Sequence, residues 1–347
     1  MTAGRVLVTG ASGMLGSAVA DLLQHRGWDV TTMQRRTAGG RHREVLGDLR
    51  DSAAVDRAVR GQDAVVHLAA KVDVTGPWLD FVDINVRGTR RVIEALRAQG
   101  GGRLVHISSP SVAHTGRSIV GEGAGPASPM HAKGHYARTK AAAELFALAA
   151  DERGERDLAV TALRPHLVWG PGDTQLVGRI AERARQGRLA LVGSGTALVD
   201  TTYVDNAAEA VVAALDRIEH ARGRAHVVTN GEPRPIGELV AGICRAVGAP
   251  PPRLRVPGPV AWGLGAAVEG VTALSARLPR VPTITEPPMT RFLAQQMSTA
   301  HWFDQRRTQE VLRWAPRVSI DEGLERLARL ERTGDGRGRA SQPDGPA

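Results

Sequence analysis

Hydrophobic and polar positions in the first half of the chain follow two alternating patterns. Short runs of apolar, β-branched residues predict strands, and longer segments with an apolar residue every three or four positions predict amphipathic helices. The predicted strands span residues 6–9, 29–33, 64–68, 103–107 and 158–163, and the predicted helices span residues 14–25, 52–59, 82–98 and 137–150. Strands that alternate with helices are typical of right-handed βαβ units, so the pattern predicts an α/β fold with a parallel sheet.

The length and spacing of the predicted elements change after Pro165. Shorter predicted elements follow there, separated by joints rich in glycine and proline. We therefore expect residues 1–165 to form the domain that carries the parallel sheet, and residues 166–332 to form mainly a smaller lobe, with residues 200–230 returning to the sheet. Residues 333–347 are rich in glycine, proline, serine and charge, which predicts a disordered tail.

Composition narrows the class of protein. The chain has 347 residues, of which 42% are hydrophobic, enough to fill a sizeable core. Its single cysteine, Cys244, excludes an intramolecular disulfide and every multi-cysteine zinc motif, and we expect no metal site. The apolar stretch 256–276 contains Glu269, so it predicts an amphipathic helix and not a membrane span. Without a signal-peptide pattern we expect a cytoplasmic protein, and contact with a membrane surface stays open.

The formal net charge of +9 would permit binding to nucleic acid. No stretch interleaves aromatic and basic residues, however, and aromatic residues make up only 3% of the chain, so we expect no nucleic-acid partner. Nearly all of the positive charge is arginine. The only lysines are Lys71, Lys133 and Lys140, and the only tyrosines are Tyr136 and Tyr203.

A glycine-rich loop directly follows the first predicted strand and opens the first predicted helix. Glycines let the backbone turn tightly and approach a pyrophosphate, whose charge is met by the N–H groups at the helix N-terminus. Because the loop lies inside a βαβ unit, it predicts a dinucleotide site. The predicted binding residues of this loop are Gly10, Ser12, Gly13, Met14, Leu15 and Gly16.

The residues after the second strand bear on the kind of dinucleotide. An NAD site usually offers an acidic side chain to the ribose 2′-hydroxyl, whereas an NADP site offers arginine to the 2′-phosphate. Here Arg35 and Arg36 follow the strand, and no acid appears before Glu44. We expect these arginines, with the Ser12 hydroxyl, to pair with a 2′-phosphate, although either one can equally be an ordinary solvated side chain. The sequence therefore favours NADP(H) over NAD(H).

Tyr136 and Lys140 stand four residues apart, on one face of a predicted helix. A lysine one turn away stabilises a phenolate and so lowers the pKa of a tyrosine toward the pH at which an enzyme works. Such a tyrosine can donate a proton to a carbonyl oxygen, or accept one from an alcohol, while hydride moves at the adjacent carbon. Ser108 and Ser109 directly follow a predicted strand, where parallel α/β sheets place ligands. The constellation predicts an oxidoreductase.

Taken together, the chain resembles the extended short-chain dehydrogenase/reductases over nearly its whole length. The resemblance is carried, in order, by the glycine loop, residues 67–70, 85–89 and 108–109, Tyr136 with Lys140, and residues 164–172. It implies a Rossmann-type doubly wound parallel sheet with a smaller C-terminal substrate lobe.

The resemblance also implies roles for individual residues. Ser109 would orient the substrate oxygen, with Ser108 beside it as a weaker candidate. Tyr136 would donate or accept the proton, and Lys140 would bind the nicotinamide ribose and tune the tyrosine. The further implied cofactor contacts are Asp48, Leu49, Ala69, Ala70, Lys71, Asn85, Pro165, His166 and Leu167.

Within that family the chain resembles the 3β-hydroxysteroid dehydrogenase branch, in particular the sterol-4α-carboxylate 3-dehydrogenases and the bacterial 2-alkyl-3-oxoalkanoate reductases of long-chain olefin biosynthesis. Residues 108–112, 162–173 and 198–206 carry this resemblance, and residues 287–292 and 301–304 favour the reductases. It implies NADPH-dependent reduction of a 2-alkyl-3-oxo acid to the 3-hydroxy acid. The implied partner is a hydrophobic small molecule that bears a carboxylate.

Several alternatives stay open at this point. A sterol-4α-carboxylate 3-dehydrogenase would run the related chemistry as an oxidation. A nucleotide-sugar epimerase or dehydratase usually carries an arginine where this chain has Val199 and Asp200. A non-catalytic NADP-binding sensor would typically have lost the tyrosine or the lysine. The sequence does not decide between a monomer and a homodimer.

Overall fold

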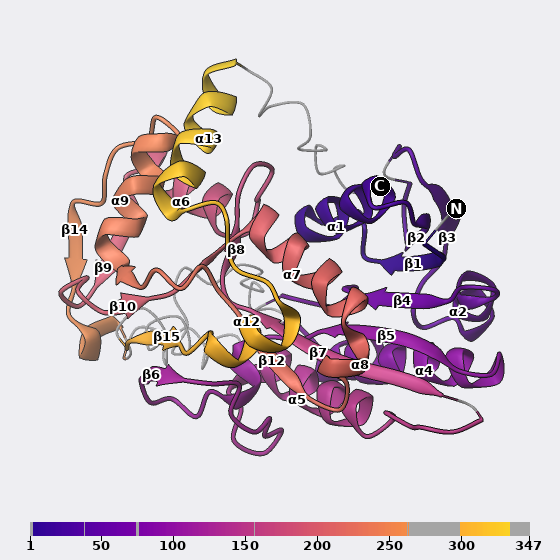
Figure 1. The fold of residues 1–347 in the computed structure, drawn as a ribbon. Coiled ribbons are helices and arrows are strands. Elements are labelled where there is room, and N and C mark those ends of the chain that lie inside the picture. Colours follow the sequence, from indigo (N-terminus) through magenta and orange to yellow (C-terminus); the bar gives the residue numbers. More distant parts are fainter. Residues whose placement is uncertain are drawn as a thin grey trace, which may run out of the picture. The chain divides into compact units, whose positions relative to one another are not determined.

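The computed structural model describes residues 3–37, 39–73, 76–155, 157–261, 263 and 299–333 (Figure 1). The chain divides into two compact units. Unit 1 comprises Met1–His166, Asp205–Thr229 and Phe303–Pro316, and unit 2 comprises Leu167–Val204, Asn230–Trp302 and Arg317–Ala347. Residues 303–316, which we had expected in the C-terminal lobe, thus belong to unit 1.

Unit 1 is built on a seven-stranded sheet in which every pairing is parallel. Its strands are β1 (Arg5–Thr9), β2 (Asp29–Gln34), β3 (Arg43–Leu46), β4 (Ala64–His67), β5 (Gly102–Ile107), β7 (Leu158–Pro165) and β12 (Ala225–Val228). They lie in the order β12-β7-β5-β4-β1-β2-β3. This order reverses direction beside β1, as in a doubly wound sheet, so the predicted Rossmann-type fold is confirmed.

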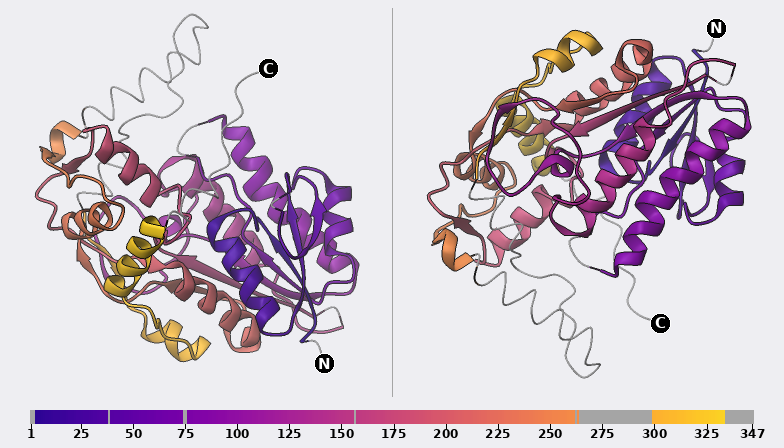
Figure 2. Two further views of the ribbon diagram at one scale, coloured as in Figure 1. Left: turned by 90° about the horizontal axis from the view of Figure 1, so that it is seen from above. Right: turned by 90° about the horizontal axis from the view of Figure 1, so that it is seen from below.

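Helices cover both faces of this sheet (Figure 2). The helical segments of unit 1 are α1 (Met14–His25), α2 (Ser52–Val59), α3 (Trp78–Phe81), η1 (Val82–Arg87), α4 (Gly88–Ala98), η2 (Pro110–Ala113), α5 (Gly134–Leu148), α7 (Val204–Asp216), α8 (Ile218–Ala221) and α12 (Arg306–Leu312); a short strand, β6 (Ile119–Glu122), precedes α5. The helix predicted over residues 82–98 is confirmed, although residues 82–87 form a wider π-helical turn and only residues 88–98 are α-helical.

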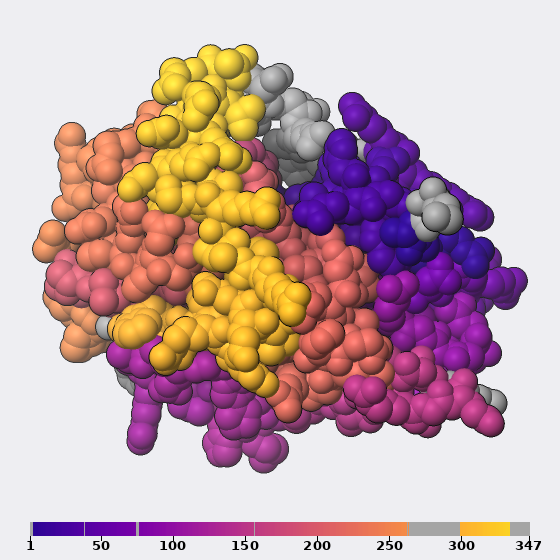
Figure 3. Space-filling view, in the orientation of Figure 1, coloured from indigo at the N-terminus to yellow at the C-terminus, as the bar shows by residue number. Residues whose placement is uncertain are grey.

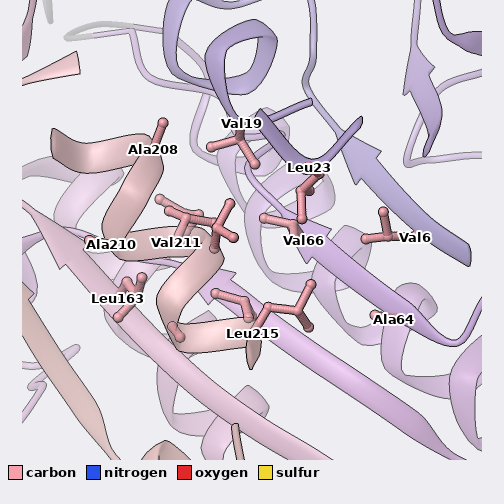
Figure 4. Close-up of a cluster of buried hydrophobic side chains, with 14 of the residues drawn as sticks. Val6, Val19, Leu23, Ala64, Val66, Leu163, Ala208, Ala210, Val211 and Leu215 are labelled. Atoms are coloured by element: carbon pink, nitrogen blue, oxygen red, sulfur yellow. The ribbon is translucent and has the colours of Figure 1, made fainter. Parts of the chain in front are cut away.

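Alternate residues of each strand supply two separate cores, because successive side chains of a strand point to opposite faces. Val6 and Val66 pack with Val19 of α1 and Val211 of α7 on one face (Figure 4). Leu7 packs with residues of α2 and α4 on the other face. Burial on both faces explains why the central strands read as continuous apolar runs and not as an alternating pattern.

The described elements of unit 2 are strands of two or three residues together with longer helices. They are β8 (Val168–Trp169), α6 (Val177–Arg185), β9 (Ala190–Val192), β10 (Leu198–Val199), β11 (Thr202–Tyr203), β13 (Arg234–Pro235), α9 (Ile236–Ala246), β14 (Leu254–Val256), β15 (His301–Phe303) and α13 (Ile320–Thr333). The space-filling view shows α13, in yellow, lying over α9 (Figure 3). A cavity of about 590 Å³ opens between the loop before β10, α9 and the start of α13, and its lining residues all come from unit 2.

Three predictions fall wholly or mostly outside the described residues. These are the amphipathic helix over residues 256–276, the segment 287–292 and the tail over residues 333–347. Within the part of the chain that the structure describes, no helix combines the length and the apolar character needed to cross a bilayer.

Candidate active site

The predicted site residues of unit 1 gather where the strands of the parallel sheet end. The glycine loop follows β1, residues 69–71 follow β4, Ser108 and Ser109 follow β5, and Pro165 ends β7. Since β7, β5, β4 and β1 are neighbours in the sheet, their carboxyl ends meet at one edge. This edge includes the point between β1 and β4 where the strand order reverses, the usual ligand position in open α/β sheets.

The glycine loop forms a tight cradle. Gly10 adopts a positive φ of 76°, and a Cβ placed there would lie 2.8 Å from the backbone nitrogen of Ala69. A Cβ on Gly16 would lie 2.2 Å from the carbonyl oxygen of Gly10. Both positions therefore exclude any side chain, because backbone atoms on the opposite side cannot move aside cheaply. Gly13 differs, since its Cβ would make an ordinary contact at 3.5 Å.

The start of α1 fits the binding of a dinucleotide pyrophosphate. Its N-cap residue is Gly13, which has no side chain that could cap the N–H groups of the first turn. Met14, Leu15 and the buried Gly16 form the first turn, while Ser12 is exposed in the loop. N–H groups at such a helix end attract an anion, and the glycines leave room for it to approach the backbone.

Substituting Gly16 by alanine is expected to destabilise unit 1 by about 1–3 kcal/mol and to abolish dinucleotide binding, because the added methyl collides with the Gly10 carbonyl. Thermal unfolding and a cofactor-fluorescence titration measure the two effects. Gly13→Ala is the matched control for the loss of stability, since its methyl finds room within the protein. Equal losses of thermal stability in the two variants would contradict the steric explanation of the loop.

The residues after β2 present charge to solvent. Arg35 and Arg36 are both exposed. Glu44, the first acid after the strand, accepts hydrogen bonds from the Gln34 amide and from the Thr37 hydroxyl, the latter at 2.6 Å. The Glu44 carboxylate therefore already accepts hydrogen bonds from within the protein.

Asp48 and Leu49 follow β3. The Asp48 carboxylate forms an ion pair with Arg50 at 2.8 Å, and this guanidinium holds the pKa of Asp48 below its usual value. Leu49 is buried in the core and packs against Gly88 at the start of α4. Asp48 is thus the more accessible of these two predicted cofactor contacts.

Residues 69–71 and Asn85 form a hydrogen-bonded unit. The Ala69 amide donates to the Thr9 hydroxyl at 3.1 Å. The Asn85 side chain accepts from the Lys71 amide at 2.7 Å, and its NH₂ group donates to the Lys71 carbonyl and to the Thr139 hydroxyl. The π-helical turn of η1 places Asn85 there. Half-buried Ala70 lies within this loop, while the Lys71 ammonium pairs with Asp73 at 2.6 Å.

Tyr136 lies in the first turn of α5, and its phenol interacts with the side chain of Ser109. Burial raises the pKa of the Tyr136 phenol to about 12, and the interaction with Ser109 acts in the opposite direction. The Ser109 hydroxyl also accepts from the Ser111 hydroxyl at 2.9 Å. Ser108 is buried, and its hydroxyl has no hydrogen-bond partner among the described residues. Ser109 is therefore the serine that meets the tyrosine.

Lys140 lies one turn further along α5 and is almost completely buried. Its ammonium donates to the Ile107 carbonyl and lies 3.5 Å from Nε2 of His106. Burial lowers the pKa of Lys140 to about 8, and the charge of Glu144 opposes that shift. The structure thus brings Ser109, Tyr136 and Lys140 together between β5 and α5.

Pro165 is the last residue of β7, and His166 and Leu167 follow it. The His166 amide donates to the Val228 carbonyl at 3.0 Å, and its ring meets Phe303 edge-on. Leu167 begins unit 2 and adopts a positive φ of 42°, a conformation uncommon for a leucine. This kink marks the passage from one unit to the other.

Two groups near Lys140 were missed by reasoning from the sequence. His106 stands in an apolar strand, and Glu144 with Arg164 forms a buried ion pair. A histidine inside a buried strand, and an acid on the apolar side of a helix, were the available signals. Across the described residues, no cluster of histidine, cysteine, aspartate and glutamate side chains could hold a metal ion.

Comparisons with known proteins agree with this geometry. A model of the "NAD dependent epimerase/dehydratase family" matches residues 6–228. The chain is 43% identical over 335 residues to a 2-alkyl-3-oxoalkanoate reductase of Stenotrophomonas maltophilia, with 93% of this chain and 98% of that protein covered. It is 37% identical over 336 residues to a 2-alkyl-3-oxoalkanoate reductase of Shewanella oneidensis, with 92% and 84% covered.

Among solved structures, MoeE5 in complex with UDP-glucose and NAD superposes with a TM-score of 0.71 at 26% identity, and the alignment covers 95% of this chain and 99% of that one. Fold, family model and relatives lead to one assignment. The chain belongs to the NAD dependent epimerase/dehydratase family and is an oxidoreductase of the extended short-chain dehydrogenase/reductase type.

Proposed function

We propose that this protein catalyses the NADPH-dependent reduction of a 2-alkyl-3-oxo acid to the corresponding 3-hydroxy acid. The observation that carries the proposal is the meeting of Ser109, Tyr136 and Lys140 at the sheet edge that also holds the glycine cradle. The substrate class rests on the relatives, two of which are named 2-alkyl-3-oxoalkanoate reductases.

In this proposal a bound nicotinamide dinucleotide supplies the hydride, and the chain's own residues move the proton. Free Tyr136 is protonated at neutral pH, since its pKa is raised to about 12, so it is ready to donate to a ketone oxygen. Ser109, whose side chain interacts with the phenol in the free protein, would turn its hydroxyl proton to the same oxygen and orient it. The Lys140 ammonium would stabilise the phenolate that the proton leaves behind.

The chemistry of the substrate explains why reduction is the useful direction. A carboxylic acid with a ketone at the β carbon loses CO₂ readily, because the ketone is an electron sink. It accepts the electron pair of the broken C–C bond and becomes an enolate. Reduction to the alcohol removes that electron sink and preserves the carboxylate. A dehydrogenase acting on a 4-carboxysterol would instead create the labile ketone.

Arg35 and Arg36 support NADP(H) as the cofactor, since they are exposed guanidinium groups after β2 and the nearby Glu44 is engaged by Gln34 and Thr37. Arg35→Ser is expected to raise the KM for NADPH about 10- to 100-fold, the loss of a charged hydrogen bond of about 1.5–3 kcal/mol, with little effect on NADH. Initial rates against both cofactors measure this.

Arg60→Ser removes an equal charge at the end of α2 and serves as the control for a general charge effect. If Arg35→Ser, Arg36→Ser and the double variant all leave the ratio of NADPH to NADH efficiency unchanged, the assignment of NADP(H) fails.

The function itself is tested by following nicotinamide absorbance with purified protein. The expected result is oxidation of NADPH with a long-chain 2-alkyl-3-oxo acid, and formation of the 3-hydroxy acid by mass spectrometry. Turnover of a 4-carboxysterol with NADP or NAD would replace the proposal by the sterol dehydrogenase, and conversion of a UDP-sugar would replace it by an epimerase. Binding of NADPH without turnover of any of these substrates would indicate a non-catalytic sensor.

A hydrophobic small molecule bearing a carboxylate is accordingly the partner we propose. Size-exclusion chromatography with light scattering, and flotation with phospholipid vesicles, would test a homodimer and peripheral membrane contact.

A further inference from the structure

A buried pair of histidines lies under Lys140. His106 on β5 and His67 on β4 have ring centroids 5.6 Å apart, and both side chains are excluded from solvent. His67 is fixed on both sides, by Thr9 at 2.8 Å and by Thr89 at 3.1 Å. His106 lacks such fixation. Its Nε2 lies 3.5 Å from the Lys140 ammonium, and its Nδ1 has no hydrogen-bond partner among the described residues.

The protonation of His106 follows from its neighbours. An ammonium can only donate hydrogen bonds, so the ring nitrogen that faces it has to present a lone pair. Burial, the charge of Lys140 and the neighbouring His67 all hold the pKa of His106 well below its ordinary value. The ring is therefore neutral, with its proton on Nδ1 and its Nε2 available as an acceptor.

The other polar and charged groups around Lys140 have interaction partners of their own. Glu144, one turn along α5, is held by Arg164 of β7 at 2.5 Å and 2.8 Å. On η1, which packs against α5, Asp83 is paired with Arg87. Tyr136, on α5 itself, interacts with Ser109. Among the described residues, the Lys140 ammonium forms hydrogen bonds with the Ile107 carbonyl and His106.

We propose that His106 is a positioning residue for Lys140: its Nε2 and the Ile107 carbonyl take two of the three ammonium N–H groups and leave the third for the reacting site. The importance of this for turnover rests on the proposed function. The anchoring itself does not, because it concerns contacts within unit 1 alone. An apolar side chain in place of His106 would leave the ammonium with one acceptor fewer and would favour its neutral form.

Selective ¹⁵N-lysine labelling makes this measurable, because the chain has only three lysines and Lys140→Arg identifies the signal of interest. In the cofactor-free protein, Lys140 is expected to titrate near pH 8. His106→Leu is expected to lower that midpoint by about one unit, a tenfold loss of proton affinity. His106→Gln, whose side-chain oxygen can occupy the place of Nε2, is expected to restore most of the shift.

Two further measurements guard against a merely structural effect. His226→Leu removes another buried histidine, on the edge strand β12, where its ring bonds to the Ala221 carbonyl. This control should leave the Lys140 titration unchanged. Should His106→Leu fail to fold, ¹⁵N-histidine spectra of the wild type and of His106→Gln report the tautomer directly. A proton on Nε2 of His106, or an unchanged Lys140 midpoint in His106→Leu, overturns the inference.

The kinetic counterpart follows from the sign of the shift. Reduction needs the ammonium form of Lys140, so activity falls as pH rises through its pKa, and a lower pKa moves that alkaline limb to lower pH. His106→Leu should therefore shift the alkaline limb of kcat/KM downward, and His106→Gln should return it. Failure of the proposed function looks different, because wild-type protein would then turn over no 3-oxo acid while the lysine titrations stayed as expected.

Discussion

Tyr136→Phe is expected to lower kcat for reduction by about 10²–10⁴-fold, the usual contribution of a general acid, while dinucleotide binding stays intact. The substitution removes one hydroxyl, which Ser109 contacts, and leaves the ring in the first turn of α5. Stopped-flow measurement of nicotinamide oxidation gives the chemical step, and a fluorescence titration gives the affinity for the cofactor. The rate should fall and the affinity should not.

The chain offers a matched control for this experiment, since it has only one other tyrosine. Tyr203 is buried in unit 2, where its ring meets Trp169 edge-on at 5.4 Å. Tyr203→Phe is expected to change kcat little, because that hydroxyl does not belong to the constellation of Ser109 and Lys140. An undiminished rate in Tyr136→Phe would leave the assigned proton donor without support.

Arg164→Met is expected to destabilise the protein by about 3–5 kcal/mol, because it leaves a buried carboxylate without its counter-charge. Arg164 and Glu144 form a bidentate pair, with both side chains at most 2% exposed. The guanidinium also donates to the carbonyls of Ala124 and Gly125 at 2.7 Å and 2.8 Å. Denaturant unfolding should show a lower midpoint and a nearly unchanged slope.

A second substitution separates the charge effect from lost packing. Arg164→Met combined with Glu144→Leu removes both charges and is expected to recover much of the stability, because no buried ion is left unpaired. Arg90→Ala, at an exposed ion pair with Glu94 on α4, should cost less than about 1 kcal/mol. A double variant as unstable as Arg164→Met alone would refute the electrostatic explanation.

The architecture was accessible from local patterns. The helices predicted over residues 14–25 and 52–59 have those same bounds in the structure, since both carry a regular apolar stripe that faces the sheet. The π-helical turn at residues 82–87 was not accessible. Within this turn, Asn85 forms hydrogen bonds with Lys71 and Thr139, which are 14 and 54 residues away in the chain.

The candidate site divides in the same way. Spacing alone placed Tyr136 and Lys140 on one helix face, because the period of an α-helix brings residues four apart together. The glycine loop was recognisable for a similar reason, since its position between a strand and a helix is a local property. The surroundings of these residues could not be predicted from local patterns, because β4, β5 and β7 come together only through the parallel pairing of the sheet.

The sequence by itself thus determined the α/β class, the family and the residues that carry the candidate chemistry, all of which depend on short-range periodicity and motif order. Only the tertiary structure decided the environment of that chemistry. It set the cradle that excludes a side chain at Gly16, the buried ion pair of Glu144 with Arg164, and the contact of His106 with Lys140. The physical reason is that burial and charge proximity, which set pKa values and the cost of an unpaired ion, arise from strands far apart in the chain.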